Sequence, residues 1–383
     1  MNKFKNIVGL VIVLSHYFAK AEEYVVIRRN IQGERLWSQT GSLTQSNIQT
    51  LNLSNEQALK LKRSGYWVEE NKKFFLPKYE KNFLTQMSKE LTKYHFWNQN
   101  QLPFNMMSTV IWPLQLIKAD KSHELPNGQG EGIKICMVDT GIDQYNPFIK
   151  NVIEDGFNFN NESNSKDISE ESLTPHGTLI STLIAGSGVL SSGEGFIGVA
   201  PKSKIIMAKV FDKDGGSTVA KVAKALIYCG ERTTVVNLSL GGYFESPMIH
   251  EILADLSKKG VTLIASAGNV GADRNESMTY PGSDPLVVGV GAIDEQMQIS
   301  SFSPIDERLD MVAPGEGILL PNQSGNLGYY SGTSFSAAYV SGVEAIRQSR
   351  KAGGLKTRDL LLSKKEQGSG IVDAFLTAND TNP

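Results

Sequence analysis

Apolar runs in the last two thirds of the chain alternate with stretches of helical periodicity, and this alternation most constrains the fold. Near-continuous apolar strands separated by helices form parallel sheets that are buried on both faces. The sequence therefore predicts an α/β fold for residues 111–383, with a three-layer, doubly wound, mainly parallel sheet. The predicted strands are residues 133–138, 204–210, 235–238, 261–265 and 286–291, and the predicted helices are residues 178–185, 218–229, 248–259 and 334–350.

Composition agrees with a folded chain of more than one part. The 383 residues are 40% hydrophobic and 20% charged, which are ordinary globular values. The net charge of −2 gives no reason to expect a nucleic-acid partner. The chain divides into residues 1–21, 22–80, 81–110 and 111–383.

The first segment has the pattern of an export signal. Lys3 and Lys5 precede the apolar run 7–14, and Ala19-Lys20-Ala21 matches a cleavage site. A run of about 8 apolar residues is too short to cross a bilayer, which takes about 20. We expect a secreted or periplasmic protein without a membrane anchor after signal removal, the alternative being a buried N-terminal segment.

Residues 22–80 predict a small α+β unit. Residues 24–27 are rich in strand formers, Ser54 and Gln57 fit a capping box, and Gly65 ends the helix that follows. Residues 66–68 and 74–76 then indicate strands. Residues 81–110 have no firm period and are interpreted as a linker with a processing region, the cut falling between about residues 76 and 107.

The two cysteines, Cys136 and Cys229, lack the spacing of metal ligands. Both lie in apolar surroundings, so two separately buried thiols are the favoured prediction. Export would make a disulfide chemically feasible, and that alternative stays open.

Polar or glycine-rich residues follow three of the predicted strands. Asp139 follows the first strand, Ser239-Leu240-Gly241 follows another, and Asn269 follows a third. Ligands of parallel sheets bind beyond the carboxyl ends of the strands. These residues therefore predict a site on one edge of the sheet.

Ser334 begins a segment whose first three turns are apolar or small on nearly every face, as in a buried helix. The helix N-terminus would stabilise developing negative charge beside this serine. A plain N-cap serine is the simpler alternative.

His176 is the best-placed histidine for a general base. His16 and His95 fall in segments expected to be removed, while His123 and His250 lie in a polar segment and early in a helix. His176 alone is followed by Gly-Thr and then an apolar run. Asp139 could orient its imidazole, and the order Asp…His…Ser is one known order for nucleophilic serine catalysis.

With these motifs, residues 112–378 resemble the subtilisin-like serine proteases, or subtilases. The resemblance rests on short motifs spread along the chain. The main ones are Val138-Asp139-Thr140-Gly141, His176-Gly177-Thr178 and Gly332-Thr333-Ser334, and the supporting ones are Gly198-Val199-Ala200-Pro201, Asn237-Leu238-Ser239-Leu240-Gly241-Gly242, Ser301-Phe302-Ser303, Ala313-Pro314-Gly315 and Gly370-Ile371-Val372-Asp373-Ala374.

The resemblance implies a serine endopeptidase made as a zymogen. Ser334 would attack the peptide carbonyl, His176 would act as base and then acid, and Asp139 would orient it. Asn269 would help form the oxyanion hole, and residues 22–80 would be an inhibitory prosegment. The implied substrate-binding residues have three roles. One wall of the cleft would be Ser239, Leu240 and Gly241, and the pocket for the residue before the cut would be shaped by Ala267 and Gly268. An extended substrate would pair as an added strand with Gly215, Gly216 and Ser217.

Several residues depart from the family pattern. Pro175 precedes the histidine, and Leu179 replaces the second histidine of the usual motif. Phe335, Ala338 and Tyr339 replace the usual methionine, proline and histidine, which puts the rate in doubt rather than the triad. At the outer cleft, Val219 and Val222 stand where bulkier side chains are often found. They predict a roomy apolar subsite.

No cofactor is expected. The acidic, asparagine-rich loop 155–171 offers oxygen ligands for structural calcium, although a solvated loop is the favoured interpretation. The expected partners are protein or peptide substrates and the prosegment, and the expected state is a monomer. The alternatives are a catalytically impaired peptide-binding subtilase, an esterase or lipase, for which the G-x-S-x-G elbow is missing, and a sedolisin-type peptidase, against which His176 speaks.

Overall fold

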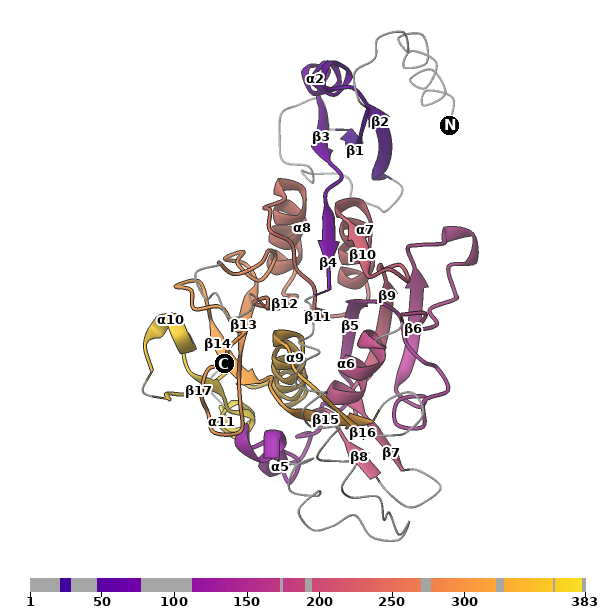
Figure 1. Ribbon diagram of the computed structural model, residues 1–383. Helices are drawn as coiled ribbons and strands as arrows, with labels where there is room; N and C mark the ends of the chain where they lie inside the picture. Colours follow the sequence, from indigo (N-terminus) through magenta and orange to yellow (C-terminus); the bar gives the residue numbers. More distant parts are fainter. Residues whose placement is uncertain are drawn as a thin grey trace, which may run out of the picture.

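The computed structural model describes residues 21–28, 47–76, 112–172, 175–189, 195–269, 277–321, 327–360 and 362–380 (Figure 1). The predicted signal up to residue 20 and the predicted linker, residues 81–110, lie outside the described residues. Within the described ranges, every helix falls short of the length and apolar character that a membrane span requires.

The centre of the molecule is the predicted parallel sheet. In the described part of the chain it has nine strands in the order β17-β18-β14-β13-β12-β11-β5-β9-β6. All neighbours pair in parallel except β17 and β18. The strands are β5 (Lys134–Asp139), β6 (Ile153–Asn158), β9 (Lys204–Lys209), β11 (Val235–Leu238), β12 (Thr262–Ser266), β13 (Val288–Ile293), β14 (Met311–Pro314), β17 (Thr357–Arg358) and β18 (Ile371–Val372).

Helices cover both faces of the sheet, so the predicted three-layer arrangement is confirmed. Alternate residues of β5 supply the two cores: Ile135 and Met137 belong to one, and Cys136 and Val138 to the other. The first core is closed by α6 (His176–Ala185), α9 (Thr333–Arg350) and α11 (Ala374–Asn379), and the second by α7 (Val219–Gly230) and α8 (Pro247–Lys258).

Short elements complete this large unit at its periphery. Two of them are antiparallel hairpins, β7 with β8 and β15 with β16. The bounds are α5 (Ala119–Ser122), η2 (Glu162–Asn164), β7 (Ser187–Val189), β8 (Gly195–Ile197), β15 (Ile318–Pro321), β16 (Leu327–Tyr330) and α10 (Lys364–Gln367).

Residues 21–28 and 47–70 form the expected small α+β unit, called here the N-terminal unit. Its antiparallel sheet has the order β2-β1-β3, and α2 lies against it. The capping box is present, because Ser54 accepts from the Gln57 N–H and Gln57 accepts from the Ser54 N–H. The elements are β1 (Glu22–Arg28), β2 (Gln49–Leu53), α2 (Asn55–Arg63) and β3 (Tyr66–Glu70).

A further strand, β4 (Lys73–Phe75), leaves the N-terminal unit and pairs with the large unit. Its antiparallel partner is β10 (Gly216–Thr218), immediately before α7. Figure 1 shows β4 running from the small sheet toward the large one between α7 and α8. The two units are therefore connected by backbone hydrogen bonds as well as by side chains.

Two predictions need correction. Cys136 on β5 and Cys229 on α7 form a disulfide with a Cα–Cα distance of 5.6 Å, so the prediction of separate thiols is wrong. Their separation of 93 residues hid the pairing, which depends on how α7 crosses the sheet. The predicted loop 155–171 begins with strand residues, because β6 extends through Asn158.

Candidate active site

Asp139 and His176 are in direct contact. Asp139 is the last residue of β5 and His176 is the first residue of α6, and both are fully buried. The His176 Nδ1 atom lies 2.7 Å from Asp139 Oδ1. A carboxylate oxygen accepts hydrogen bonds, so this geometry suits donation from His176 Nδ1 to Asp139.

Glycine permits this close approach. An added Cβ on Gly177 would lie 2.2 Å from the Gly141 carbonyl oxygen and 3.1 Å from Asp139 Oδ1. The first distance is a severe clash, so a larger residue would push α6 away from β5. The glycine of the His-Gly-Thr motif is therefore required by the Asp139–His176 contact.

Ser334 is the second residue of α9 and is almost fully buried. Within the described part of the chain its Oγ has no hydrogen-bond partner. Its carbonyl oxygen accepts from Ser239 Oγ at 3.1 Å, which links the start of α9 to the residues after β11. The hydroxyl lies at the positive end of a long helix, which favours developing negative charge.

Asn269 also lies at the start of α9. Its Oδ1 accepts from the Thr333 N–H and from Thr333 Oγ1, both at 3.0 Å. Because the amide oxygen is engaged in this way, the amide nitrogen is the donor end. An added Cβ on Gly332 would lie 3.1 Å from that nitrogen, and Gly332 has a φ of +155°, so glycine suits this position.

These side chains follow three neighbouring strands. Asp139 ends β5, Ser239 follows β11, and Asn269 follows β12, and the three strands are adjacent in the order β5-β11-β12. Neighbouring strands are about 4.8 Å apart, and α6 packs against α9. The structure thus brings the carboxyl ends of these strands and the starts of both helices to one edge of the sheet.

The predicted wall residues are held by a residue that sequence reasoning missed, Thr279. An added Cβ on Gly241 would lie 2.4 Å from Thr279 Oγ1, and one on Gly268 would lie 2.8 Å from it. The Thr279 N–H also donates to the Ala267 carbonyl at 2.9 Å. Thr279 therefore packs between the segment that contains Gly241 and the segment that contains Gly268. Leu240, in the first segment, is fully buried.

The predicted substrate-pairing segment already holds an extended strand of this chain. Gly216 lies opposite Phe75 and Ser217 opposite Phe74 in the β10–β4 pair. On the other side, the Phe75 N–H donates to the Gly241 carbonyl at 2.9 Å, and the Phe75 carbonyl accepts from the Gly241 N–H at 3.1 Å. β4 is thus hydrogen-bonded on both sides. Next to this pair, Gly215 has a φ of +76°.

The two phenylalanines of β4 point to opposite environments. Phe74 is fully buried in the core cluster that includes Val219 and Val222, and its ring centroid lies 4.9 Å from that of Phe244. Phe75 is 52% exposed. Phe74 therefore lies in an apolar environment that it shares with residues of α7.

The unusual residues of the serine motif fit the helix. Phe335, Ala338 and Tyr339 are buried, and α9 continues unbroken through them to Arg350. Ser336 Oγ donates to the Ala313 carbonyl at 3.0 Å, which fixes the first turn. The replacement of proline by alanine thus leaves a regular helix behind Ser334. Pro175 lies just before α6, and Leu179 is fully buried within it.

Three carboxylates of the 155–171 stretch have lysine or tyrosine partners. Asp155 contacts Lys166 and Tyr228. Glu162 is paired with Lys224, and Glu171 with Lys209. Within the described ranges, no three His, Cys, Asp or Glu residues gather as a metal-binding group.

Comparisons with known proteins agree with this geometry. The "Major intracellular serine protease" of Bacillus subtilis (strain 168) is 34% identical over 227 residues, covering 58% of this chain and 70% of that protein. The "Intracellular serine protease" of Paenibacillus polymyxa is 30% identical over 253 residues, covering 62% and 77%. Thermitase of Thermoactinomyces vulgaris is 28% identical over 259 residues, covering 67% and 89%.

The profile of the family described as "Subtilase family" matches residues 130–374, which is more than half of the chain. This range contains β5, α6, α9 and the residues gathered at their ends. The match and the relatives together identify a subtilisin-like serine endopeptidase. The chain belongs to the subtilase family.

Proposed function

We propose that the chain hydrolyses peptide bonds of protein substrates through Asp139, His176 and Ser334, and that it is made as an exported zymogen. The observation that carries the catalytic assignment is the 2.7 Å contact between His176 Nδ1 and Asp139 Oδ1. Asp139 ends β5, and the neighbouring strand is β11. Ser239, which follows β11, donates a hydrogen bond to the Ser334 carbonyl, so Ser334 is attached next to this contact.

In this mechanism Ser334 Oγ attacks the scissile carbonyl while His176 Nε2 takes its proton. Asp139 stabilises the imidazolium that forms, and His176 then returns the proton to the leaving amine. Water repeats the sequence on the acyl-enzyme. Burial of Asp139 and His176 strengthens their interaction, since the site has a lower effective dielectric constant than water.

The tetrahedral oxyanion would be stabilised by the Asn269 side-chain amide and the Ser334 N–H. The two hydrogen bonds from Thr333 to Asn269 Oδ1 support this assignment, because they leave the amide nitrogen as the donor. A donor of this kind in a subtilisin contributes about 2.7–4 kcal/mol to transition-state stability.

The N-terminal unit would inhibit the enzyme until it is removed. The support is β4, which takes the place an extended substrate would take between Gly216 and Gly241. A substrate would add to the same edge as a strand, with backbone hydrogen bonds providing affinity and side-chain pockets providing specificity. Cleavage of the chain after β4 would be required before substrate could bind.

Two side chains at the end of the N-terminal unit and just after it support the same proposal. Glu69 Oε2 accepts from the Met248 N–H at 3.0 Å, and Asn71 Oδ1 accepts from the Ala220 N–H at 3.0 Å. Both donors lie in the first turns of helices, where backbone N–H groups lack partners within the helix. The N-terminal unit thereby stabilises α8 and α7 while it covers the cleft, and this would assist folding.

The subsite filled by Phe74 would select substrates. Phe74 belongs to the same buried apolar cluster as Val219 and Val222, and its ring contacts that of Phe244. We therefore propose that the mature enzyme favours a large apolar residue at the corresponding substrate position. Substrate profiling that found a preference for charged residues there would contradict this proposal.

Export is supported by two independent features. The first is the signal-like start with Lys3, Lys5 and Ala19-Lys20-Ala21. The second is the Cys136–Cys229 disulfide, since disulfides persist mainly in oxidising compartments. N-terminal sequencing of protein from cell fractions tests this, and an uncleaved N-terminus in the cytoplasm would overturn it.

The proposed partners are protein or peptide substrates and the N-terminal unit itself. Triad hydrolysis uses only side chains and water, so we propose that it needs no cofactor. Structural calcium is a separate question that chelation can test. We propose a monomer, which sedimentation of the mature enzyme would check.

The deciding experiment compares the intact mass of the chain, expressed without its first 21 residues, with that of the Ser334→Ala variant. We expect the wild type to lose its N-terminal segment and the variant to remain full length. The mass of the mature wild type would locate the cleavage site. Added peptide substrate should be hydrolysed by the mature wild type alone.

Other outcomes would contradict the proposal. If the folded variant loses the same segment, Ser334 is not the nucleophile of processing. If both proteins stay full length and a cut by an added protease yields a folded form that binds peptides without hydrolysing them, the alternative of an impaired peptide-binding subtilase is correct.

A further inference from the structure

The Thr140 hydroxyl lies at the junction of two carboxylates. Thr140 Oγ1 is 2.7 Å from Glu170 Oε2 and 3.2 Å from Asp139 Oδ1, and it accepts from the Gly177 N–H at 2.9 Å. The Thr140 N–H also donates to Asp139 Oδ1 at 2.7 Å. One hydroxyl proton therefore serves two acceptors, only one of which is the carboxylate that contacts His176.

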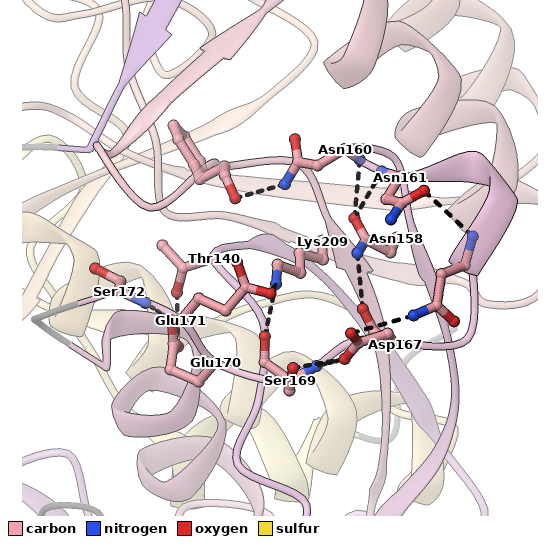
Figure 2. Close-up of polar contacts among 12 residues, drawn as sticks. Thr140, Asn158, Asn160, Asn161, Asp167, Ser169, Glu170, Glu171, Ser172 and Lys209 are labelled. Carbon is pink, nitrogen blue, oxygen red and sulfur yellow. Dashed lines mark hydrogen bonds and ion pairs between the residues drawn. The ribbon is translucent and has the colours of Figure 1, made fainter.

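Glu170 is held in this position by the surrounding backbone. The Ile142 N–H donates to the Ile168 carbonyl at 2.8 Å, and Lys209 Nζ donates to the Ser169 carbonyl at 2.7 Å. An added Cβ on Gly141 would lie 2.6 Å from that same Ser169 oxygen, so Gly141 permits the approach. The segment carrying Glu170 thus lies directly against the residues that follow Asp139 (Figure 2).

The surroundings of Glu170 make its charge sensitive to pH near neutrality. The pKa of Glu170 is raised to about 7, mainly by burial and also by the Asp139 charge. The Thr140 hydroxyl, the Ser172 N–H and His176 act in the opposite direction. The nearby lysine, Lys209, instead pairs with Glu171 at 3.1 Å. Figure 2 shows this division, with Glu170 turned to Thr140 and Glu171 to Lys209.

We propose that Glu170 is a positioning residue for catalysis, acting through the Thr140 hydroxyl on the Asp139–His176 pair. This inference rests on the proposed function, which gives that pair its catalytic role. Glu170 touches neither substrate nor the reacting atoms. Its effect is to decide where the Thr140 proton points and how much negative charge lies beside His176.

The two protonation states of Glu170 act differently on the pair. When Glu170 is ionised, Thr140 donates to it, and a second negative charge stabilises the protonated imidazole of His176. When Glu170 is protonated, it can donate to Thr140, and Thr140 then donates to Asp139. The weaker negative charge then favours the neutral, catalytically competent imidazole at lower pH.

The test is the pH dependence of kcat/KM for the mature wild type and for the Glu170→Gln variant. Glutamine is neutral and its amide can donate to Thr140, so it mimics the protonated state. The acidic limb should move to lower pH by about half to one pH unit, the scale of one nearby charge. The kcat at the plateau and KM should stay within about twofold, because the hydrogen bond to Thr140 is retained.

Glu170→Ala separates position from charge. It should show the same shift of the acidic limb, together with a fall in kcat of about tenfold at unchanged KM, since Thr140 loses its contact with residue 170 and keeps only Asp139 as an acceptor. The matched control is Glu171→Gln, which removes the neighbouring carboxylate that pairs with Lys209. It should leave the acidic limb where the wild type has it.

A second readout does not require activity. In the Ser334→Ala protein, NMR should show the midpoint of His176 imidazole titration at lower pH when Glu170→Gln is added, with Glu171→Gln again without effect. His176→Gln identifies the resonance. If Glu170→Gln changes neither the acidic limb of the kcat/KM profile nor the midpoint of the His176 titration, the proposal is overturned. A shifted midpoint in an enzyme that hydrolyses no peptide would instead refute the proposed function alone.

Discussion

The large unit and the N-terminal unit bury their apolar residues in different ways. The large unit has a core on each face of its sheet, and both are closed by its own helices. The N-terminal unit has one small core of Tyr24, Val26, Leu53, Ala58 and Val68.

The other face of β1 in the N-terminal unit depends on the large unit. Val25 and Ile27, which alternate with the small-core residues, belong to the core cluster that also contains α7 and α8. A unit of this size buries only a modest fraction of its surface, so its stability alone is marginal. The N-terminal unit therefore depends on contacts with the large unit for part of its burial.

The largest expected effect concerns Phe74, which connects the two units. The test uses a separately made segment, residues 22–80, which contains the N-terminal unit and β4. Phe74→Ala should weaken inhibition of the mature enzyme by this segment, since loss of a buried phenylalanine costs about 3–5 kcal/mol. This corresponds to an increase of at least about 100-fold in the inhibition constant. Phe75→Ala is the control, because Phe75 is 52% exposed. Equal effects of both substitutions would show that the subsite is not the main contact.

The disulfide tests the large unit by itself. Replacing Cys136 and Cys229 together by alanine should lower the free energy of unfolding by about 2–4 kcal/mol. Urea denaturation of the Ser334→Ala protein, with and without the two substitutions, measures this. Inhibition by the N-terminal unit should be unaffected at low denaturant, and an unchanged unfolding midpoint would mean that the bond contributes nothing.

The helix contacts of the N-terminal unit are expected to have a smaller effect. Glu69→Ala or Asn71→Ala removes an acceptor from the first turn of α8 or α7, which typically costs about 0.5–2 kcal/mol. Each should raise the inhibition constant about 2- to 30-fold. Gln49→Ala, an exposed site on β2, is the control. If neither substitution exceeds the control, water replaces these acceptors without loss.

Chelation is expected to have the smallest effect. Because Asp155, Glu171 and Glu162 of the 155–171 stretch are paired with Lys166, Lys209 and Lys224, EDTA should leave the Tm of the Ser334→Ala protein unchanged. Differential scanning calorimetry with and without EDTA checks this, with added calcium as the reverse control. A lower Tm in EDTA, restored by calcium, would reveal a structural calcium site.

Much of the fold was predictable because its signals are local. A short apolar run before Asp139 identifies a strand, and a small, apolar segment after Ser334 identifies a helix. Each signal lies within a few neighbouring residues. The observed β5 and α9 begin within one residue of the predicted starts. The edge of the sheet where the site lies followed from the same alternation, since strands of a parallel sheet end together.

Other features could not be read from local patterns. Glu170 was a member of an acidic loop in the sequence, and its contact with Thr140 spans 30 residues. Neither Thr279 nor Phe74 belongs to a recognisable motif. Thr279 packs between Gly241 and Gly268, and Phe74 lies in the buried cluster that contains Val219 and Val222. The cysteine pair was predicted as two separate thiols for the same reason.

Local patterns were enough to predict the parallel sheet, the order of Asp139, His176 and Ser334, and the glycine-rich segments around them. Three contacts follow only from the folded arrangement: the bond between Cys136 and Cys229, the pairing of β4 with Gly216 and Gly241, and the contact of Glu170 with Thr140. Strand and helix periods repeat over a few residues and can be read along the chain. Contacts between distant segments depend on where the packed layers bring them, and no short-range pattern records that.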